Sequence, residues 1–158
     1  MALPNTLGVM QGIQSLINGL SPNPYKTVAL EAFKDWTNAD PVCEIAFSQD
    51  DSEHFASGGV VQDIQGFRIT SAVLFAGASA VVTPTQAITS LCTCRDAVVP
   101  LFQQHAYLGG VQGVSDSRVK PGSFKLSVVT DNGNDYLVHE FLVEVESQYT
   151  VPIGVQGI

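Results

Sequence analysis

One stretch near the end of the chain, YLVHEFLVEVESQYTV at residues 136–151, alternates between apolar and polar side chains. A period of two predicts a β-strand with one largely apolar face, and the opposite face carries the carboxylates of Glu140, Glu144 and Glu146. Sixteen extended residues would span about 50 Å, roughly two to three times the length of a typical strand. The fold therefore has to accommodate one strand that is unusually long and acidic on one side.

The composition indicates a single domain whose surface is poor in charge. The chain has 158 residues, enough for one domain with a substantial core. Charged residues make up 14% of it, against about 25% in ordinary soluble proteins, whereas the hydrophobic share of 45% is ordinary. The simplest interpretation is that other subunits cover part of the surface. The alternative is a monomer with few surface charges.

The net charge of −8 argues against tight binding to nucleic acid. No Lys or Arg follows Lys125, whereas five carboxylates do, three of them in the predicted long strand. A protein that grips phosphates would show a basic patch. An acidic surface that repels nucleic acid is consistent with this distribution.

The cysteines and the uncharged segments argue against a disulfide framework, a secretory signal and a membrane span. Three cysteines, with a C-x-C pair at Cys92 and Cys94, do not form the pattern of a disulfide framework and suit a reducing compartment. No basic region precedes the apolar residues at the start of the sequence, so we expect no secretory signal. Residues 69–94 carry no charge, but polar residues and a proline interrupt them, so we predict a buried strand followed by a helix and no membrane span.

Helical spacing and capping residues predict two helices. The first covers residues 6–20, with Asn5 or Thr6 as its cap. The second begins at the capping box TPTQ (83–86), and its apolar stripe continues until Pro100 kinks or ends the helix.

Alternating and β-branched residues predict strands at 26–34, where the spacing of the apolar residues also fits a helix and a strand is favoured, and at 41–49, 67–77, 124–130 and 136–151. Residues 59–65 can extend the third of these strands. We expect a polar connector at 49–59, a long glycine-rich loop at 108–124 and a tight turn at Asn132-Gly133. The result is a single α+β domain, in which a mostly antiparallel sheet packs against two helices and residues 151–158 form an uncharged extended tail.

No group of residues indicates a catalytic or metal site. DNGND at 131–135 lacks the distal Glu of a calcium loop, so a hairpin turn is favoured. His139 and Glu140 point to opposite faces of a strand and cannot share a metal. One acidic cluster with a histidine lies in the predicted connector and consists of Asp50, Asp51, Glu53 and His54. It is compatible with a weakly bound cation, although a solvated loop is favoured. We therefore predict no enzyme, no cofactor and no metal.

The elements follow one another in a familiar order. An N-terminal amphipathic helix precedes acidic hairpins, a helix containing TCRDAVVPLFQQH, a glycine-rich loop and a hairpin ending in HEFLVEVESQYTV. This layout resembles the tail terminator (tail completion) proteins of long-tailed bacteriophages over nearly the whole chain, without a diagnostic motif. The resemblance implies a small α/β domain that assembles into a hexameric ring, caps the tail tube and joins the tail to the head connector.

The resemblance also implies a virion protein that is present in the host cytoplasm during assembly. Its partners would be the tail tube protein and a head–tail connector or neck protein, and DNA would pass through the ring without sequence-specific binding. The long strand can then begin in its own sheet and end against a neighbouring subunit, where it covers an exposed edge.

In such a ring the three glutamates of 136–151, here called the acidic row, have two possible positions. They either line the channel, where they repel phosphates, or meet basic residues of the next subunit. The negative balance after Lys125 favours the channel slightly. The basic candidates lie in the glycine-rich loop and at its end: Arg118, Lys120 and Lys125.

Two alternatives stay open. Another neck or tail-tube subunit would also explain the charge-poor composition and the acidic row, although a tube protein would have more strands and no capped central helix. A small ligand-binding or enzymatic α+β domain would use the cluster at residues 50–54.

Overall fold

The computed structural model describes residues 5–30, 41–57, 59–77, 83–131 and 133–150, and of residues 49–57 only the backbone. These segments form a single α+β domain, which confirms the predicted fold class. The helices are α1 (Thr6–Asn18), α2 (Pro84–Val98) and α3 (Leu101–Gln104). The strands are β1 (Thr27–Ala29), β2 (Val42–Ser57), β3 (Val60–Ala76), β4 (Val114–Val119), β5 (Lys125–Asp131) and β6 (Asn134–Thr150).

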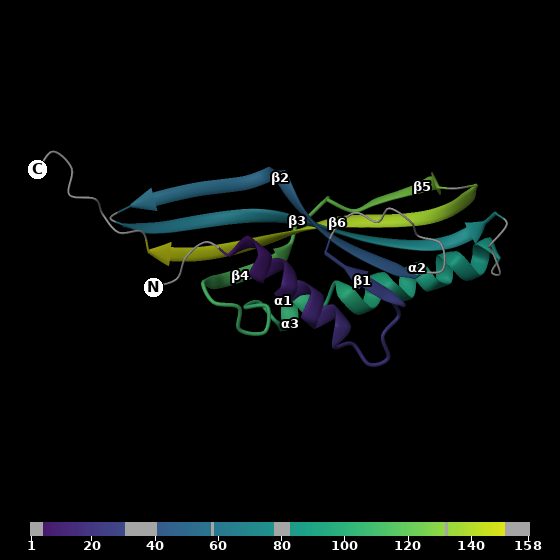
Figure 1. The fold of residues 1–158 in the computed structure, drawn as a ribbon, viewed down its shortest axis with the longest axis horizontal. Helices are drawn as coiled ribbons and strands as arrows, with labels where there is room; N and C mark the ends of the chain where they lie inside the picture. Colours follow the sequence, from purple (N-terminus) through teal and green to yellow (C-terminus); the bar gives the residue numbers. More distant parts are fainter. Residues whose placement is uncertain (1–4, 31–40, 58, 78–82, 132, 151–158) are drawn as a thin grey trace, which may run out of the picture.

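The described strands form one six-stranded sheet with β6 in its interior (Figure 1). The strand order is β1-β2-β3-β6-β4, and β5 pairs with β6 on the same side as β4. β1 runs parallel to β2, and every other pair is antiparallel. The prediction of a mostly antiparallel sheet is therefore confirmed.

The sheet uses nearly the whole length of β6. On one side β3 pairs with it from Asp135 to Thr150. On the other side β5 pairs with residues 134–140 and β4 with residues 143–147. The length of β6 is thus explained by three partner strands of the same chain and does not require a neighbouring subunit.

β4 and β5 form one interrupted edge strand, and β4 lies within the long loop that the sequence predicts at 108–124. Both run antiparallel to β6, and the interruption falls opposite Leu142. The Lys120 N–H donates to the Leu142 carbonyl (2.8 Å), and the Ser123 hydroxyl accepts from the Leu142 N–H (3.0 Å) while donating to the Lys120 carbonyl (2.6 Å). At the interruption the Ser123 hydroxyl thus takes the place of a backbone carbonyl as the acceptor for the Leu142 N–H. Without an acceptor, this half-buried amide would cost free energy.

β2 and β3 form a longer hairpin than the sequence predicted. The backbone of β2 continues through the expected connector (49–59) to Ser57, with one irregularity in its register. β3 starts at Val60, so it extends the strand predicted at 67–77. A polar sequence does not prevent this pairing, because the hydrogen bonds of an antiparallel ladder come from the backbone.

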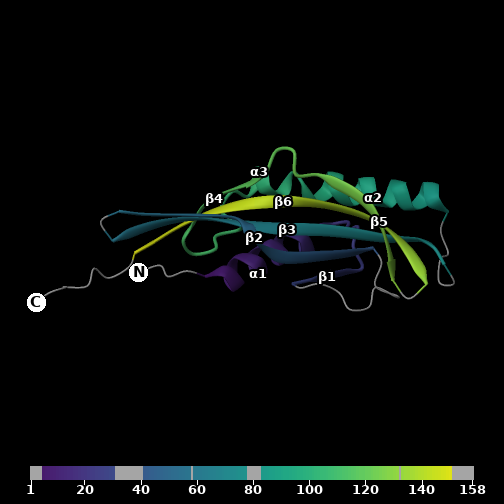
Figure 2. The same ribbon diagram turned by 90° about the horizontal axis from the view of Figure 1, so that it is seen from above.

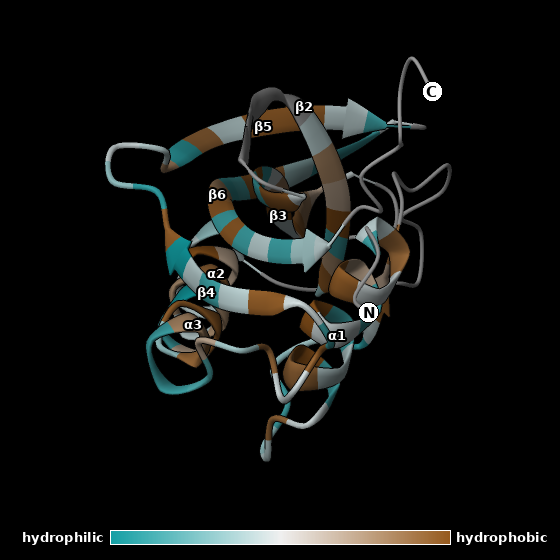
Figure 3. Ribbon diagram, turned by 90° about the vertical axis from the view of Figure 1, so that its left-hand side faces the viewer, coloured by the Kyte–Doolittle hydropathy of each residue, from teal (hydrophilic) through white to brown (hydrophobic). Residues whose placement is uncertain are grey.

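All three helices lie on one face of the sheet (Figure 3). α1 packs against β1 and β2, and α2 packs against β3 and β6. Seen from above, the two helices lie along opposite margins of the sheet (Figure 2). The main core between helices and sheet includes Ile13, Ile17, Phe67, Ile69, Phe102, Phe141, Val143 and Val145. A smaller buried cluster on the opposite face consists of Val42, Ala72, Leu74, Tyr136 and Val138.

The local signals in the sequence predicted the starts of α1 and α2 correctly, whereas α1 ends at Asn18, two residues before the predicted end. The Asn5 side chain accepts a hydrogen bond from the Gly8 N–H (3.0 Å) at the start of α1. Thr83 and Gln86 make both hydrogen bonds of the predicted capping box (3.2 and 2.8 Å). Pro100 separates α2 from α3, as its missing N–H predicts. β1 confirms a strand within 26–34, of which residues 31–34 lie outside the described residues.

We expect Ser123→Ala to lower the free energy of unfolding by about 1–2 kcal/mol, because the half-buried Leu142 N–H loses its acceptor. Urea denaturation measures this change. The control is Ser127→Ala, which alters an exposed serine of β5 and should change the free energy of unfolding by less than about 0.5 kcal/mol. Equal losses in the two variants would show that Ser123 does not bridge the interruption.

Candidate functional site

The acidic row lies on the face of the sheet opposite the helices. Its glutamates occupy even positions of β6, whereas Phe141, Val143 and Val145 at odd positions belong to the main core. The side chains of Glu140, Glu144 and Glu146 are 29%, 22% and 21% exposed, so each remains in contact with water. The shared face that the period of two predicts is observed.

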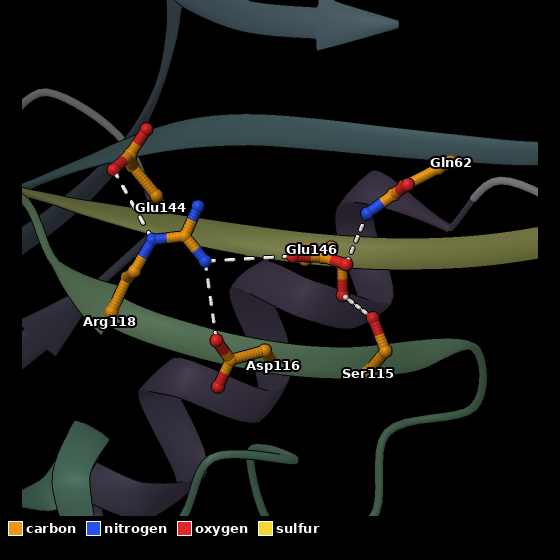
Figure 4. A network of polar contacts seen from close by, with 6 residues as sticks. All are labelled: Gln62, Ser115, Asp116, Arg118, Glu144 and Glu146. Carbon is orange, nitrogen blue, oxygen red and sulfur yellow. Dashed lines mark hydrogen bonds and ion pairs between the residues drawn. The ribbon is translucent and has the colours of Figure 1, made fainter. Parts of the chain in front are cut away.

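Figure 4 shows how Arg118 of β4 holds the two glutamates near the end of β6. Its guanidinium lies 3.5 Å from the carboxylate of Glu144, 3.6 Å from that of Glu146 and 3.2 Å from that of Asp116. The register produces this arrangement, because Arg118 lies opposite Glu144 and Asp116 lies opposite Glu146. Gln62 of β3 donates a further hydrogen bond to Glu146. One cation serves three carboxylates, so this cluster keeps a net negative charge.

Glu140 lies farther along the row and has different basic neighbours. The guanidinium of Arg68 on β3 is 3.7 Å from its carboxylate. Lys125 of β5 is its cross-strand partner. On the other side Glu140 lies opposite Thr70, which in turn lies opposite Glu44 of β2. Carboxylates on this face are therefore distributed across the sheet, at Glu44, as well as along β6 in the acidic row.

The three basic residues that we expected on one loop do not share a loop. Arg118 and Lys125 lie in β4 and β5, and only Lys120 lies in the connection between them. The ion pairs of Arg118 are made within its own chain. The prediction of a basic loop is therefore wrong, because pairing with β6 organises this segment into strands. A contact of these residues with another subunit stays a prediction.

On the described part of this face, acidic side chains outnumber basic ones. The carboxylates are those of Glu44, Asp116, Asp131, Glu140, Glu144 and Glu146, and the basic side chains are those of Arg68, Arg118 and Lys125. Backbone pairing on both sides of β6 holds these groups in fixed positions. Such a surface repels phosphates and offers a polyanion no net counter-charge.

The other end of β6 carries an apolar cleft that the sequence did not predict. The cleft lies between α2 and the β5–β6 hairpin, has a volume of about 280 Å³ and is lined by Ile88, Leu91, Cys92, Arg95, Leu126, Leu137 and His139. The alternation of apolar residues in FKLSV (124–128) indicated that one side of β5, which forms a wall of this cleft, is apolar. The α2 wall could not be deduced, because it depends on how the helix packs against the sheet.

His139 lines this cleft and is buried, with 7% of its surface exposed. Its ring stacks on Phe124 with 5.5 Å between the centroids, and its Nδ1 atom has no hydrogen-bond partner among the described residues. Burial lowers the pKa of His139 below its ordinary value, and the nearby Arg95 guanidinium lowers it further. The neutral imidazole is therefore the form that suits the cleft.

The buried thiols do not form a nucleophilic site. The hydroxyl oxygens of Tyr25 and Ser71 lie 2.5 Å apart, beside Cys43 and Cys94 in the core. Burial raises the pKa of the Cys94 thiol to about 11 and also raises the pKa values of Cys43 and Tyr25. These groups stay protonated at neutral pH, whereas a nucleophilic cysteine needs the thiolate form.

Among the side chains that the structure describes, no three His, Cys, Asp or Glu residues are grouped so that they could hold a metal ion. The predicted cluster at residues 50–54 lies outside the described side chains. The favoured hairpin is observed on both sides of Asn132, which lies outside the described residues: Asp131 pairs with Asn134, and Gly133 has a φ of 77°. No helix in the described segments is long and apolar enough to cross a membrane.

Comparison with known proteins identifies no family for this chain. No family model matches it, and a search of curated proteins gives no match either. The functional argument therefore depends on the sequence layout and on the geometry of the two surfaces described above.

We expect Arg118→Ala to lower the free energy of unfolding by about 1–2 kcal/mol at low salt, because three carboxylates lose their common cation. Salt should reduce this loss by screening the repulsion among the carboxylates. Chemical denaturation at two salt concentrations measures both effects. Arg68→Ala is the matched control, because Arg68 has one carboxylate within ion-pair distance among the described residues, and its loss should be smaller.

His139 should make the stability of the fold depend on pH. Because its pKa is lower in the folded chain than the ordinary 6.5, the unfolded chain binds more protons between these two values. The contribution of neutral His139 to the free energy of unfolding is thus complete above about pH 6.5. It is lost as the pH falls through the lowered pKa of His139. His139→Gln should reduce this acid destabilisation, measured by urea denaturation from pH 7.5 to 5. His105→Gln, at an exposed histidine, should leave it unchanged.

Proposed function

We propose that this chain is a structural subunit of a bacteriophage tail. It forms a closed ring, most simply a hexamer, that caps the tail tube and joins it to a head connector or neck protein. DNA passes through the channel of the ring without sequence-specific binding. The sequence layout supports this assignment, and two surfaces of the fold fit it.

The observation that carries the proposal is the net negative, helix-free face of the sheet. A channel for DNA has to let a polyanion slide without sticking to its wall. Carboxylates held on paired strands and incompletely neutralised by Arg68, Arg118 and Lys125 meet that demand. Their side chains are partly exposed, as a wetted wall requires. We therefore assign this face to the channel.

The second supporting observation is the clustering of exposed apolar side chains at the end of the fold that carries the cleft. Of nine exposed large hydrophobic side chains in the described part of the chain, five belong to α2, β5 or the residue before β5: Ile88, Phe124, Leu126, Val128 and Val129. Exposed apolar surface that is gathered at one end of a fold marks an interaction site. In a ring this end would contact the next subunit.

We expect the triple variant Glu140→Gln, Glu144→Gln, Glu146→Gln to form the ring normally and to slow DNA ejection. The ring contacts lie elsewhere, whereas the channel wall loses three negative charges and becomes more attractive to phosphates. Native mass spectrometry measures the ring, and DNA release from particles assembled with the variant measures ejection. Asp96→Asn, on the exposed side of α2, is the control.

The assembly itself is tested by the mass of the wild-type protein, alone and on tail tubes. We expect a closed oligomer under at least the second condition, and copies of the chain at the neck of purified particles. A chain that remains a monomer on tail tubes, or is missing from particles, would contradict the proposed function. A weaker ring in the triple variant would instead place the acidic row at the contact between subunits.

A further inference from the structure

β5 is an exposed edge strand with an apolar side. Its only partner among the described residues is β6, and no described strand pairs with the backbone groups on its outer side. Every side chain from Lys125 to Thr130 is exposed, including Leu126 (66%) and Val128 (56%). Edge strands of this kind are templates for an added strand from another chain.

The apolar side of β5 continues into the cleft against α2. Leu126 lines the cleft, and Phe124 and Val128 lie on the same side of the strand because side chains alternate. Arg95, the charged residue at the cleft, already lies over the ring of Phe124, 4.5 Å from its centroid, and 3.6 Å from the carboxylate of Asp96. The surface therefore fits an extended, apolar and uncharged partner rather than an anionic one.

Residues 151–158, which lie outside the described residues, have the apolar and uncharged sequence VPIGVQGI that such a partner requires. They carry no charged side chain, and apolar residues at Val151, Ile153 and Val155 alternate with Pro152 and others. This spacing matches that of Phe124, Leu126 and Val128, so the two segments can place apolar side chains opposite one another on one face. Pro152 lacks an N–H group and is compatible with a strand at the edge of a sheet.

The segment cannot reach the β5 edge of its own chain. Thr150 ends β6 at one end of the elongated sheet, and β5 lies toward the other end (Figure 1). Thr150 is eleven residues from His139, the partner of Leu126, which corresponds to about 36 Å along the strand. The eight residues that follow Thr150 span at most about 26 Å. The segment and a matching edge therefore meet only between different copies.

We propose that residues 151–158 of one copy add a strand to β5 of a second copy and fill its apolar cleft. Donor and acceptor surfaces differ, so the contact is head-to-tail, and repeated contacts close into a ring or continue as an open chain. The inference deepens the proposed function and rests on it for ring closure. The strand addition itself requires only two copies of the chain.

A peptide binding experiment tests the added strand directly. The acceptor is a chain truncated after Thr150, and the probe is a fluorescent peptide with the sequence VPIGVQGI. We expect saturable binding, and we expect Leu126→Lys to weaken it at least about tenfold. Leu7→Lys, at a side chain of α1 that is 60% exposed, is the matched control and should bind normally. A lack of saturable binding, or equal weakening in the two variants, would overturn the inference.

A cross-linking experiment tests the contact in the full chain. Cys92 is exposed and lines the cleft, whereas Cys43 and Cys94 are buried. Wild-type chain is mixed with the double variant Cys92→Ser, Val155→Cys and treated with a short bismaleimide. We expect a link between position 92 of one chain and position 155 of the other. Links only between two copies of position 92, or only between two copies of position 155, would assign the cleft to another occupant and overturn the inference.

The two proposals fail in different ways. If the truncated chain forms a ring as stable as that of the full chain, the strand addition is wrong and the proposed ring stands. If positions 92 and 155 are linked in open chains that never close on tail tubes, the strand addition stands and the proposed ring is wrong.

Discussion

The fold depends on the backbone hydrogen bonds on both sides of β6. β3 covers one side of it, and the interrupted strand β4–β5 covers most of the other. Once this pairing is fixed, alternation places Phe141, Val143 and Val145 against the helices and the glutamates on the opposite face. A slip of one residue in the register would exchange the two faces, so the buried core specifies where the acidic row lies.

Signals that act over a few residues predicted the structure well. The cap at Asn5, the capping box at Thr83 and the hairpin connection between Asp131 and Asn134 depend on neighbours in sequence, and so does the period of two that defines the acidic row. The strand β4 and the extension of β2 were missed, because each is stabilised by a partner strand distant in sequence. For the same reason the sequence identified Arg118 as a possible ion-pair partner of the acidic row but could not show that it lies opposite Glu144.

The acidic face is difficult to explain by stability alone. Ion pairs between partly exposed side chains contribute about 0–1 kcal/mol each, and a cluster in which Arg118 serves three carboxylates also contains mutual repulsion. Uncharged polar side chains at the same positions would support the strands without this repulsion. The charges are more readily understood as a property of a surface that repels a polyanion, which is the reason for our proposal that DNA passes along this face.

The matched lengths of β3 and β6 restrict how this sheet can become longer or shorter. Each strand has 17 residues, so an insertion in one needs a counterpart in the other. One inserted residue adds about 3.3 Å and turns all following side chains to the other face, whereas two residues add about 6.6 Å and preserve the faces. The one odd residue in this ladder, Phe75, lies in a bulge near the end of β3, where few side chains follow it. Homologous sheets should therefore differ in length by even numbers of residues, so the dimensions of any assembly built from them would change in discrete steps.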